Sequence, residues 1–354
     1  NEYQGYMSEE DKATVRTQAL HVIRTFRDGG CQLPLAPSAD TIHRMMNFIV
    51  ATDVPQDYVP MMLEEMELDG TDQRCDAWGK EVPAARRAQH KVLVIGGGMS
   101  GVLAAYRLQE ADIPFVVIEK NPAVGGTWFE NRYPGVRVDV GNHLYSYSFE
   151  PAHHWTQFFA QQPELQQYFE GVMYHHQLEQ HFRFNTEVTG AVFDEESNLW
   201  TVDTIDKHGV TEQYVVNSVI SAVGQLNRPK LPDIPGIESF RGQWCHAAAW
   251  DDTIDCTGKK VAVVGSGASA FQLVPAIAGK VKHLTVFQRS APWMFENPIY
   301  HENVPEGTKW CLQHLPFYTR WFRFLIFWPA CDGAYDTVFV DPNWPHQERS
   351  INEM

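Results

Sequence analysis

Three glycines at Gly96, Gly98 and Gly101 have the spacing of a turn that binds a dinucleotide. The first glycine allows a tight turn, the second lets a pyrophosphate approach the backbone, and the third lets a helix pack closely on a strand. The helix that follows would direct its backbone amides at the phosphates, so Met99 and Ser100 are expected to contact them too. The spacing therefore predicts a binding site for an adenine dinucleotide.

An acidic residue ends the next apolar run of the chain. The run 91–95 precedes the glycines and the run 115–118 follows them, so Glu119 stands where a second buried parallel strand would end. A carboxylate there accepts hydrogen bonds from ribose hydroxyl groups, and its charge opposes a 2′-phosphate. The first site, with Lys120 beside Glu119, is therefore expected to bind FAD or NAD rather than NADP.

A second glycine-rich turn follows later in the chain and has alanine in the third place. It reads Gly265-Ser266-Gly267-Ala268-Ser269-Ala270. Gln288 and Arg289 stand where the first unit has its acidic residue, and a guanidinium can bind a 2′-phosphate through two hydrogen bonds. The second site is therefore expected to bind NADPH. Two sites of different preference in one chain imply that NADPH reduces FAD.

Two further stretches resemble the signature motifs of the Baeyer–Villiger monooxygenases. The stretch from Gly125 to Asp139 matches G-G-x-W-x-x-x-x-Y-P-G-x-x-x-D. The stretch from Phe240 to Trp250 matches F-x-G-x-x-x-H-x-x-x-W and lies just before the second glycine turn, as in that family. With both glycine turns in order, the resemblance covers the chain from residue 90 to about residue 300 and implies FAD and NADPH as cofactors.

The resemblance also assigns roles to individual residues. It places Asp139 near the flavin and the catalytic arginine, where the carboxylate would orient the guanidinium, and it makes His246 an orienting residue that couples NADP position to domain closure. The remaining assigned FAD contacts are Gly126, Thr127, Trp128, Tyr145 and Val188, and the hinge element comprises Phe240, Gly242, His246 and Trp250. By the family's spacing, the active-site arginine would lie beyond Met354.

The activity implied by the resemblance is the insertion of one oxygen atom of O2 next to the carbonyl of a small-molecule ketone, giving an ester or a lactone. Aromatic ketones are candidate substrates. A related flavin monooxygenase that oxygenates nitrogen or sulfur, and an inactive FAD-binding fragment, remain alternatives. If the protein ended at Met354, no ketone turnover would be expected. The absence of a C-x-x-C pair argues against a dithiol reductase.

The expected fold class is α/β, with two Rossmann-like domains for FAD and NADPH and an α-helical N-terminal extension. The extension is assigned to residues 1–89, the first part of the FAD domain to 90–225, and the linker, NADPH domain and helical insert to 226–354. Ser8 and Ser38 are expected to begin helices of the extension. The extension resembles that of the 4-hydroxyacetophenone monooxygenase branch, so we expect a packing or dimerisation module that would make the protein a homodimer.

Composition excludes several classes of partner. A formal net charge of −16 repels nucleic acid, and the chain has no apolar run of about 18 residues that could span a membrane. Six scattered cysteines fit a reducing cytoplasm. His175, His176 and His181 lie near Glu179 without an evident third ligand, so no metal site is predicted. The aromatic stretch 310–328 is interpreted as a helical insert, with a substrate tunnel or a membrane contact as alternatives.

Overall fold

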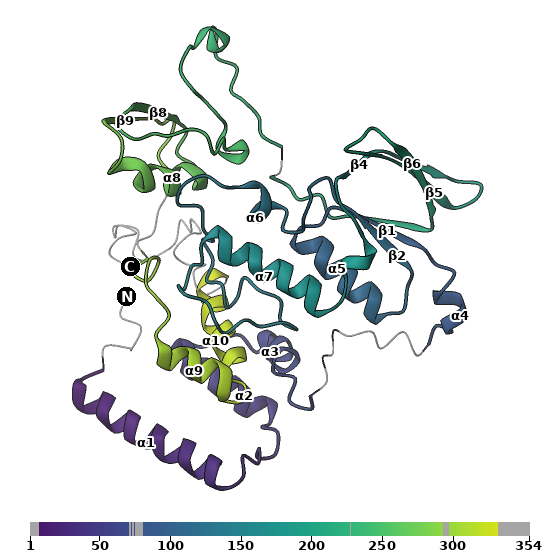
Figure 1. The fold of residues 1–354 in the computed structure, drawn as a ribbon. Coiled ribbons are helices and arrows are strands. Elements are labelled where there is room, and N and C mark those ends of the chain that lie inside the picture. The colour runs from purple at the N-terminus through teal and green to yellow at the C-terminus, as the bar shows by residue number, and fades with distance from the viewer. Residues whose placement is uncertain are drawn as a thin grey trace, which may run out of the picture. The chain divides into compact units, whose positions relative to one another are not determined.

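The computed structural model describes residues 7–70, 72, 74, 81–226, 228–292 and 297–331, and Figure 1 shows it as a ribbon. The chain divides into two units, Asn1–Thr71 and Asp72–Met354. The domain boundaries expected at 89/90 and 225/226 stay predictions. Residues 71, 73 and 75–80 of the expected N-terminal extension lie outside the described residues.

Three helices form most of the described part of the first unit. They are α1 (Glu9–Asp28), α2 (Ala39–Val50) and α3 (Val59–Met66), and the 3₁₀ turn η1 (Gln56–Tyr58) precedes α3. The Ser8 hydroxyl accepts the Asp11 N–H at 3.1 Å, and the Ser38 hydroxyl accepts the Thr41 N–H at 3.2 Å. Both predicted helix starts are confirmed, because these hydroxyls satisfy amides that have no partner within the helix.

A four-stranded parallel sheet forms the centre of the second unit. Its strands are β1 (Val92–Ile95), β2 (Phe115–Ile118), β3 (Phe182–Arg183) and β7 (Ser218–Ser221), in the order β3-β2-β1-β7. Val92 pairs with Phe115 on one side and with Ser218 on the other. The chain therefore returns to the first nucleotide unit at β7, which lies directly beside β1, before it continues to the second.

The two faces of this sheet are covered by different structures. Helices α5 (Met99–Glu110) and α7 (Gln162–His175) run side by side in Figure 1. The same part of the chain also contains the short helices α4 (Ala84–Arg87) and α6 (Thr127–Glu130) and the 3₁₀ turn η3 (Glu179–His181). Val92 and Val94 join the core cluster that α5 and α7 complete, whereas Leu93 faces an antiparallel sheet. That sheet comprises β4 (Thr186–Asp194), β5 (Leu199–Asp206) and β6 (Thr211–Val216). Side chains that alternate along a strand produce these two cores.

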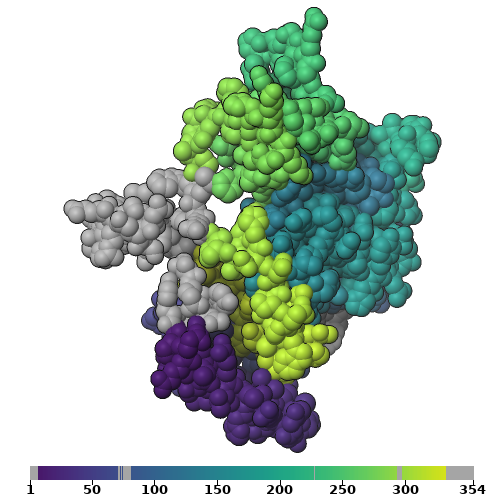
Figure 2. All heavy atoms as spheres, turned by 60° about the vertical axis from the view of Figure 1, so that its left-hand side comes forward, coloured from purple at the N-terminus to yellow at the C-terminus, as the bar shows by residue number. Residues whose placement is uncertain are grey.

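A second β-α-β element follows the 3₁₀ turns η4 (Ile237–Ser239) and η5 (Ala247–Ala249). It comprises β8 (Lys260–Val264), α8 (Ala268–Ala278) and β9 (His283–Phe287), and its two strands are parallel. Figure 2 shows the green atoms of this region directly against the blue and teal atoms of the first nucleotide unit. Leu273 and Ile277 of α8 belong to the same core cluster as α5 and α7, so the two β-α-β elements share apolar packing.

The aromatic stretch near the end of the described chain is helical. It forms α9 (Glu306–His314), α10 (Tyr318–Phe327) and the 3₁₀ turn η6 (Trp328–Ala330), and residues 332–354 lie outside the described part. Arg323 of α10 is buried and donates to the backbone oxygens of His143 at 2.7 Å and Ser146 at 3.2 Å. Arg320 donates to the Ser148 oxygen at 2.8 Å. The two arginines therefore connect α10 to the segment 143–148 by hydrogen bonds.

Two expectations from the sequence, on membrane-spanning segments and on cysteines, can be compared with the described residues. Within the described residues, every helix is either too short or too polar to cross a bilayer. The described cysteines are free thiols, and Cys75 lies outside the described residues.

The buried imidazole of His143 predicts an acid-dependent loss of stability. Neither ring nitrogen has a hydrogen-bond partner among the described residues, and burial, with His153 and Arg323 nearby, lowers the pKa of His143 to about 4. An unfolded histidine takes up its proton near pH 6.5, so the unfolded chain binds more protons between these values. The free energy of unfolding should therefore decrease, by at most roughly 3 kcal/mol, as the pH falls from about 6.5 to about 4.

Urea unfolding between pH 7 and pH 4.5 tests this dependence. His143→Phe should flatten the decrease, because its ring lies among aromatic neighbours such as Phe322, whose ring centroid is 5.0 Å from that of His143. His208→Asn, at an exposed turn residue, is the control and should keep the wild-type slope. Equal slopes in wild type and His143→Phe would contradict the assignment.

Candidate functional site

The first glycine turn is closed so tightly that side chains cannot be accommodated. Gly96 has φ +105°, and a Cβ there would lie 2.6 Å from the Ala222 carbonyl oxygen. A Cβ on Gly101 would lie 1.9 Å from the Gly96 carbonyl oxygen. Gly98 is the N-cap of α5 and makes no side-chain capping bond, which leaves the first amides of the helix without a side-chain partner. The turn therefore presents free amides at the positive end of a helix dipole, as phosphate binding requires.

Glu119 lies directly behind this turn. Its carboxylate is buried and accepts the backbone N–H groups of Gly97 and Asn121, the latter at 2.7 Å. Burial raises the pKa of Glu119, and the Asn121 and Gly97 amides oppose that increase. The sequence places Glu119 at the end of a strand, and the structure adds that two amides fix its orientation beside the glycine turn. Lys120, in contrast, points its ammonium to Glu130 at 2.9 Å.

The second glycine turn repeats the backbone connection of the first. The Gly265 N–H donates to the Phe287 oxygen at 2.8 Å, just as the Gly96 N–H donates to the Ile118 oxygen at 2.8 Å. Gly265 has φ +111°, and Gly267 caps α8 without a side-chain bond. At the edge of this turn, Gln288 and Arg289 are exposed. The Arg289 guanidinium is therefore open to solvent where a 2′-phosphate would approach.

The segment from Gly125 to Asp139 passes between the two nucleotide elements. Gly126 has φ +52° and begins α6, and its Cα lies close enough to Gly98 that a Cβ on Gly126 would be 2.9 Å from the Gly98 Cα. Trp128 is buried and donates its indole N–H to the Tyr145 hydroxyl at 3.3 Å. The close approach of Gly126 to Gly98 brings the signature segment against the first glycine turn.

Gln272 of α8 joins the signature segment to the second nucleotide element. Its side-chain oxygen accepts the Tyr133 hydroxyl at 2.9 Å and the Arg137 N–H at 3.3 Å, while its side-chain nitrogen donates to the Arg137 oxygen at 2.8 Å and to the Tyr300 hydroxyl at 3.0 Å. Gly135 lets the helix approach, because a Cβ there would lie 2.7 Å from the Gln272 carbonyl oxygen. The sequence analysis missed Gln272, since all its partners lie 28 or more residues away.

A cleft of about 830 Å³ opens beside this junction. Its lining combines the signature segment with the second glycine turn and includes Gly135, Arg137, Ser266, Ala270, Gln288 and Tyr300. Volumes of this order suit a small-molecule or cofactor site. The structure therefore brings together one of the two glycine turns and the signature segment at a single cavity.

Asp139 lies exposed at the end of the signature segment, close to three tyrosine hydroxyls. Burial raises the pKa values of Tyr133, Tyr145 and Tyr300, and the Asp139 charge adds to the increase in each case. The three phenols that feel the Asp139 charge therefore remain protonated at neutral pH.

The fingerprint around His246 is held by local bonds. His246 is the N-cap of η5, and its Nδ1 accepts the Ala248 N–H at 3.1 Å. The neutral ring therefore carries its proton on Nε2. Phe240 is exposed and leans over Gly242, while Trp250 packs against the shared core. This geometry fits an orienting histidine, and the hinge role itself stays a prediction.

Val188 and Tyr147 pack in the first nucleotide unit. Val188 of β4 packs on the core between the parallel and antiparallel sheets, beside Ile118. Tyr147, which the sequence analysis missed, donates its hydroxyl to the Met99 oxygen at the start of α5. The segment 143–150 thus contacts the start of α5, directly after the glycine turn, although no sequence motif marks it.

The fold and its two glycine turns define a class of protein with two dinucleotide-binding β-α-β elements in one chain. Residues 93–315 match the family model described as pyridine nucleotide-disulphide oxidoreductase. Because the match includes both glycine turns and more than half of the chain, this protein belongs to that family.

Several known proteins are similar to this chain over much of its length. A protein of Sinorhizobium fredii named as an uncharacterised monooxygenase is 36% identical over 350 residues, which span 99% of this chain and 52% of that protein. A Baeyer–Villiger monooxygenase of Pseudomonas aeruginosa is 42% identical over 61% of this chain and 41% of its own length. The crystal structure of OTEMO with FAD and NADP matches with a TM-score of 0.53 and 36% identity over 57% of this chain and 39% of that one. This chain therefore spans about half the length of the relatives it matches.

Proposed function

We propose that this protein is a Baeyer–Villiger monooxygenase that binds FAD at the first glycine turn and NADPH at the second. It inserts one oxygen atom of O2 next to the carbonyl of a ketone to give an ester or a lactone. The observation that carries this proposal is the cleft of about 830 Å³ lined by both the Gly125–Asp139 signature and the second glycine turn. The relatives from Pseudomonas aeruginosa and the OTEMO complex support it.

FAD fits the first site on physical grounds. A Cβ at Gly96, Gly98 or Gly126 would meet backbone atoms first, so the turn is bounded by backbone there, and the Gly98 N-cap of α5 makes no side-chain capping bond. Glu119 holds its carboxylate beside the turn, where ribose hydroxyls would donate to it. The diphosphate of FAD matches the amide donors at the start of α5, and its adenosine ribose matches the Glu119 carboxylate as acceptor.

NADPH fits the second site for a complementary reason. The first amides of α8 follow Gly267 without a side-chain cap, and no carboxylate follows β9. Arg289 supplies positive charge at the same point. Bound FAD would supply the electron transfer and the oxygen chemistry, while the protein orients the two cofactors. Gln272 bonds α8 to the signature segment, so it would help to hold the second glycine turn in place relative to that segment.

Two measurements test the proposed function in sequence. Protein loaded with FAD should lose its flavin absorbance when NADPH is added without oxygen, and with oxygen and a ketone it should release an ester or a lactone. Oxygenation of an amine or a sulfide without reaction of ketones would assign the related chemistry instead. A protein that stays colourless after incubation with FAD would overturn the proposal at its first step.

Arg289→Ala should weaken the binding of NADPH and leave NADH nearly unaffected. The change removes a charge-assisted pair with the 2′-phosphate, so the Kd for NADPH should increase about 10- to 100-fold. Equilibrium titration of the FAD-loaded protein with each nucleotide measures this. Arg24→Ala in α1 removes an exposed arginine of the other unit and is the matched control. Equal losses for NADPH and NADH would show that Arg289 does not recognise the phosphate.

We further propose that the N-terminal extension places the protein in the 4-hydroxyacetophenone monooxygenase branch and forms a homodimer contact. The match to the Sinorhizobium fredii protein includes the extension, since it covers 99% of this chain. Helix α1 has no buried residue, and Val15, Leu20 and Val22 are exposed on it. Sedimentation equilibrium tests the second part: a dimer mass in the wild type and a monomer mass for Val22→Glu are expected, and a monomeric wild type contradicts it.

A further inference from the structure

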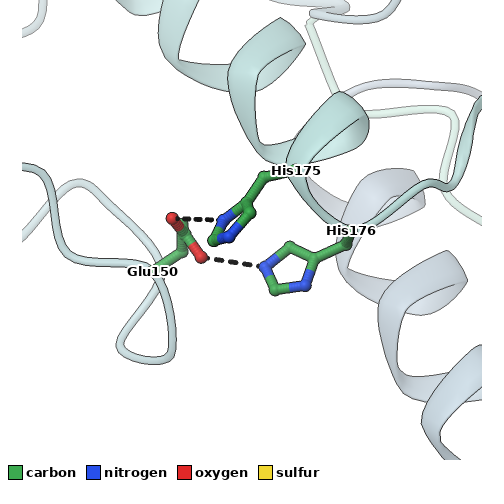
Figure 3. A group of neighbouring side chains, drawn as sticks. All are labelled: Glu150, His175 and His176. Carbon is green, nitrogen blue, oxygen red and sulfur yellow. Dashed lines mark hydrogen bonds and ion pairs between the residues drawn. The ribbon is translucent and has the colours of Figure 1, made fainter.

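Three potential metal ligands converge at the end of α7, far in the sequence from either glycine turn. Glu150 points its carboxylate between the imidazoles of His175 and His176, as Figure 3 shows. The distances are 3.0 Å from Glu150 Oε1 to His175 Nδ1 and 2.8 Å from Glu150 Oε2 to His176 Nε2. Each of the three residues offers one ligand atom that lies within 4.8 Å of the atoms offered by the other two.

Glu179, which is close to these histidines in the sequence, does not meet them as part of the same helix. Helix α7 ends at His175, and Glu179 belongs to the separate turn η3. The carboxylate that His175 meets belongs instead to Glu150, 25 residues earlier. Only the folded chain brings this third ligand to the pair of histidines.

We propose that Glu150, His175 and His176 form a binding site for one Zn²⁺ ion. Two imidazoles and one carboxylate are a known zinc ligand set, which leaves a fourth position for water. Zinc bonds of about 2.0–2.2 Å require ligand atoms some 3–3.5 Å apart, and the Glu150 oxygens lie 3.0 Å and 2.8 Å from the histidine nitrogens, close to that spacing. Each imidazole would then carry its proton on the ring nitrogen that faces away from the ion.

The surrounding contacts hold two of the three ligands in place before any ion binds. The Glu150 backbone oxygen accepts the Tyr168 hydroxyl at 2.8 Å, and Tyr168 lies two turns before His175 on α7. The His176 ring packs edge-on against Tyr106, with centroids 4.6 Å apart, and its backbone oxygen accepts the Gln109 side-chain amide at 2.9 Å. A preorganised ligand set loses little conformational freedom on binding.

Access and charge also favour a cation at this place. His175 is exposed, and His176 and Glu150 are only partly buried, so an ion and its water can enter from solvent. Arg107, whose guanidinium lies over the ring of Phe149 next to Glu150 in the chain, forms ion pairs with Asp72 at 2.8 Å and Glu110 at 2.7 Å, and these offset its charge. The net charge of −16 adds a long-range attraction for cations.

The ion would reinforce the segment that supports the first glycine turn. Glu150 follows Tyr147 by three residues, and Tyr147 donates to the Met99 oxygen at the start of α5. A bridge from Glu150 to the end of α7 would therefore anchor residues 147–150 at both ends. Binding to the folded state alone raises the unfolding free energy as the Zn²⁺ concentration increases.

Titration of the metal-free protein with ZnCl2 in a calorimeter tests the proposal. We expect one saturable site in the micromolar range, and a higher melting temperature in the presence of Zn²⁺. Glu150→Gln and His176→Asn should each weaken the binding by about tenfold or more. His208→Asn, which removes an exposed histidine in a distant turn, should bind as the wild type does.

A second probe keeps the test decisive if a variant is poorly folded. Co²⁺ added to the wild-type protein should give visible absorption bands of a four-coordinate nitrogen and oxygen site, and Zn²⁺ should displace them. Failure of the wild type to bind one equivalent of Zn²⁺, or binding that neither Glu150→Gln nor His176→Asn weakens in variants with wild-type circular dichroism, would overturn the proposal. Neither outcome depends on FAD, NADPH or catalytic activity.

Discussion

Gly101→Ala is expected to abolish FAD binding and to destabilise the second unit. The added Cβ would lie 1.9 Å from the Gly96 carbonyl oxygen and 2.9 Å from its carbonyl carbon. Backbone atoms cannot rotate away as a side chain can, so α5 must move off the glycine turn. We expect a loss of about 3 kcal/mol or more in the free energy of unfolding, together with loss of the yellow flavin after gel filtration.

The matched control is a glycine in a helix of the same unit. A Cβ on Gly171 of α7 meets no atom within 4 Å, so Gly171→Ala should keep FAD and stabilise the protein by about 0.5–1 kcal/mol. Urea unfolding and the ratio of flavin to protein absorbance measure both effects. A Gly101→Ala protein that retains stoichiometric FAD and unfolds with the wild type would show that the turn can open without cost.

Gln272→Met is expected to uncouple the second nucleotide element from the signature segment. Methionine has a similar length but no amide, so the Tyr133 hydroxyl and the Arg137 backbone N–H and oxygen lose their bonds to residue 272. Each buried polar group left without a partner costs about 1–3 kcal/mol. We therefore expect a loss of about 3 kcal/mol or more in unfolding free energy and slower NADPH-dependent reduction of bound FAD.

Stopped-flow reduction of the flavin separates the two effects of this change. The reduction rate should fall more than the affinity for FAD, because the first glycine turn is left intact while α8 loses its bonds to the signature segment. Gln180→Met removes an exposed glutamine that makes one local bond, and it should change stability by no more than about 0.5 kcal/mol. Wild-type rates and stability in Gln272→Met would refute the coupling.

Local patterns in the sequence predicted the nucleotide elements well. The spacing of Gly96, Gly98 and Gly101 between two short apolar runs predicts a β-α-β unit, and the parallel pairing of β1 with β2 confirms it. The runs are short and rich in β-branched residues, as strands buried on both faces must be. The same reasoning predicted β8, α8 and β9, since neighbouring residues determine both the turn and the helix start.

Contacts between residues far apart in the chain could not be predicted from the sequence. Gln272 is a polar residue on a largely apolar helix, and nothing near it in the chain indicates that its four hydrogen bonds go to Tyr133, Arg137 and Tyr300. Likewise, Glu179 is close to His175 in the sequence, whereas the carboxylate that meets His175 in the folded chain belongs to Glu150. Separation along the chain carries no information about such pairs until packing has closed the intervening loops.

By itself, the sequence determined that this protein has two glycine turns, an acidic end to one strand and an arginine after another. These are local features, because each depends on a few consecutive residues and on steric limits that any chain obeys. Only the tertiary structure decided that the signature segment and the second turn line one cleft, that Gln272 joins them, and that Glu150 meets two histidines. Those arrangements depend on how α7 and α8 pack, and packing is a property of the whole core rather than of any segment.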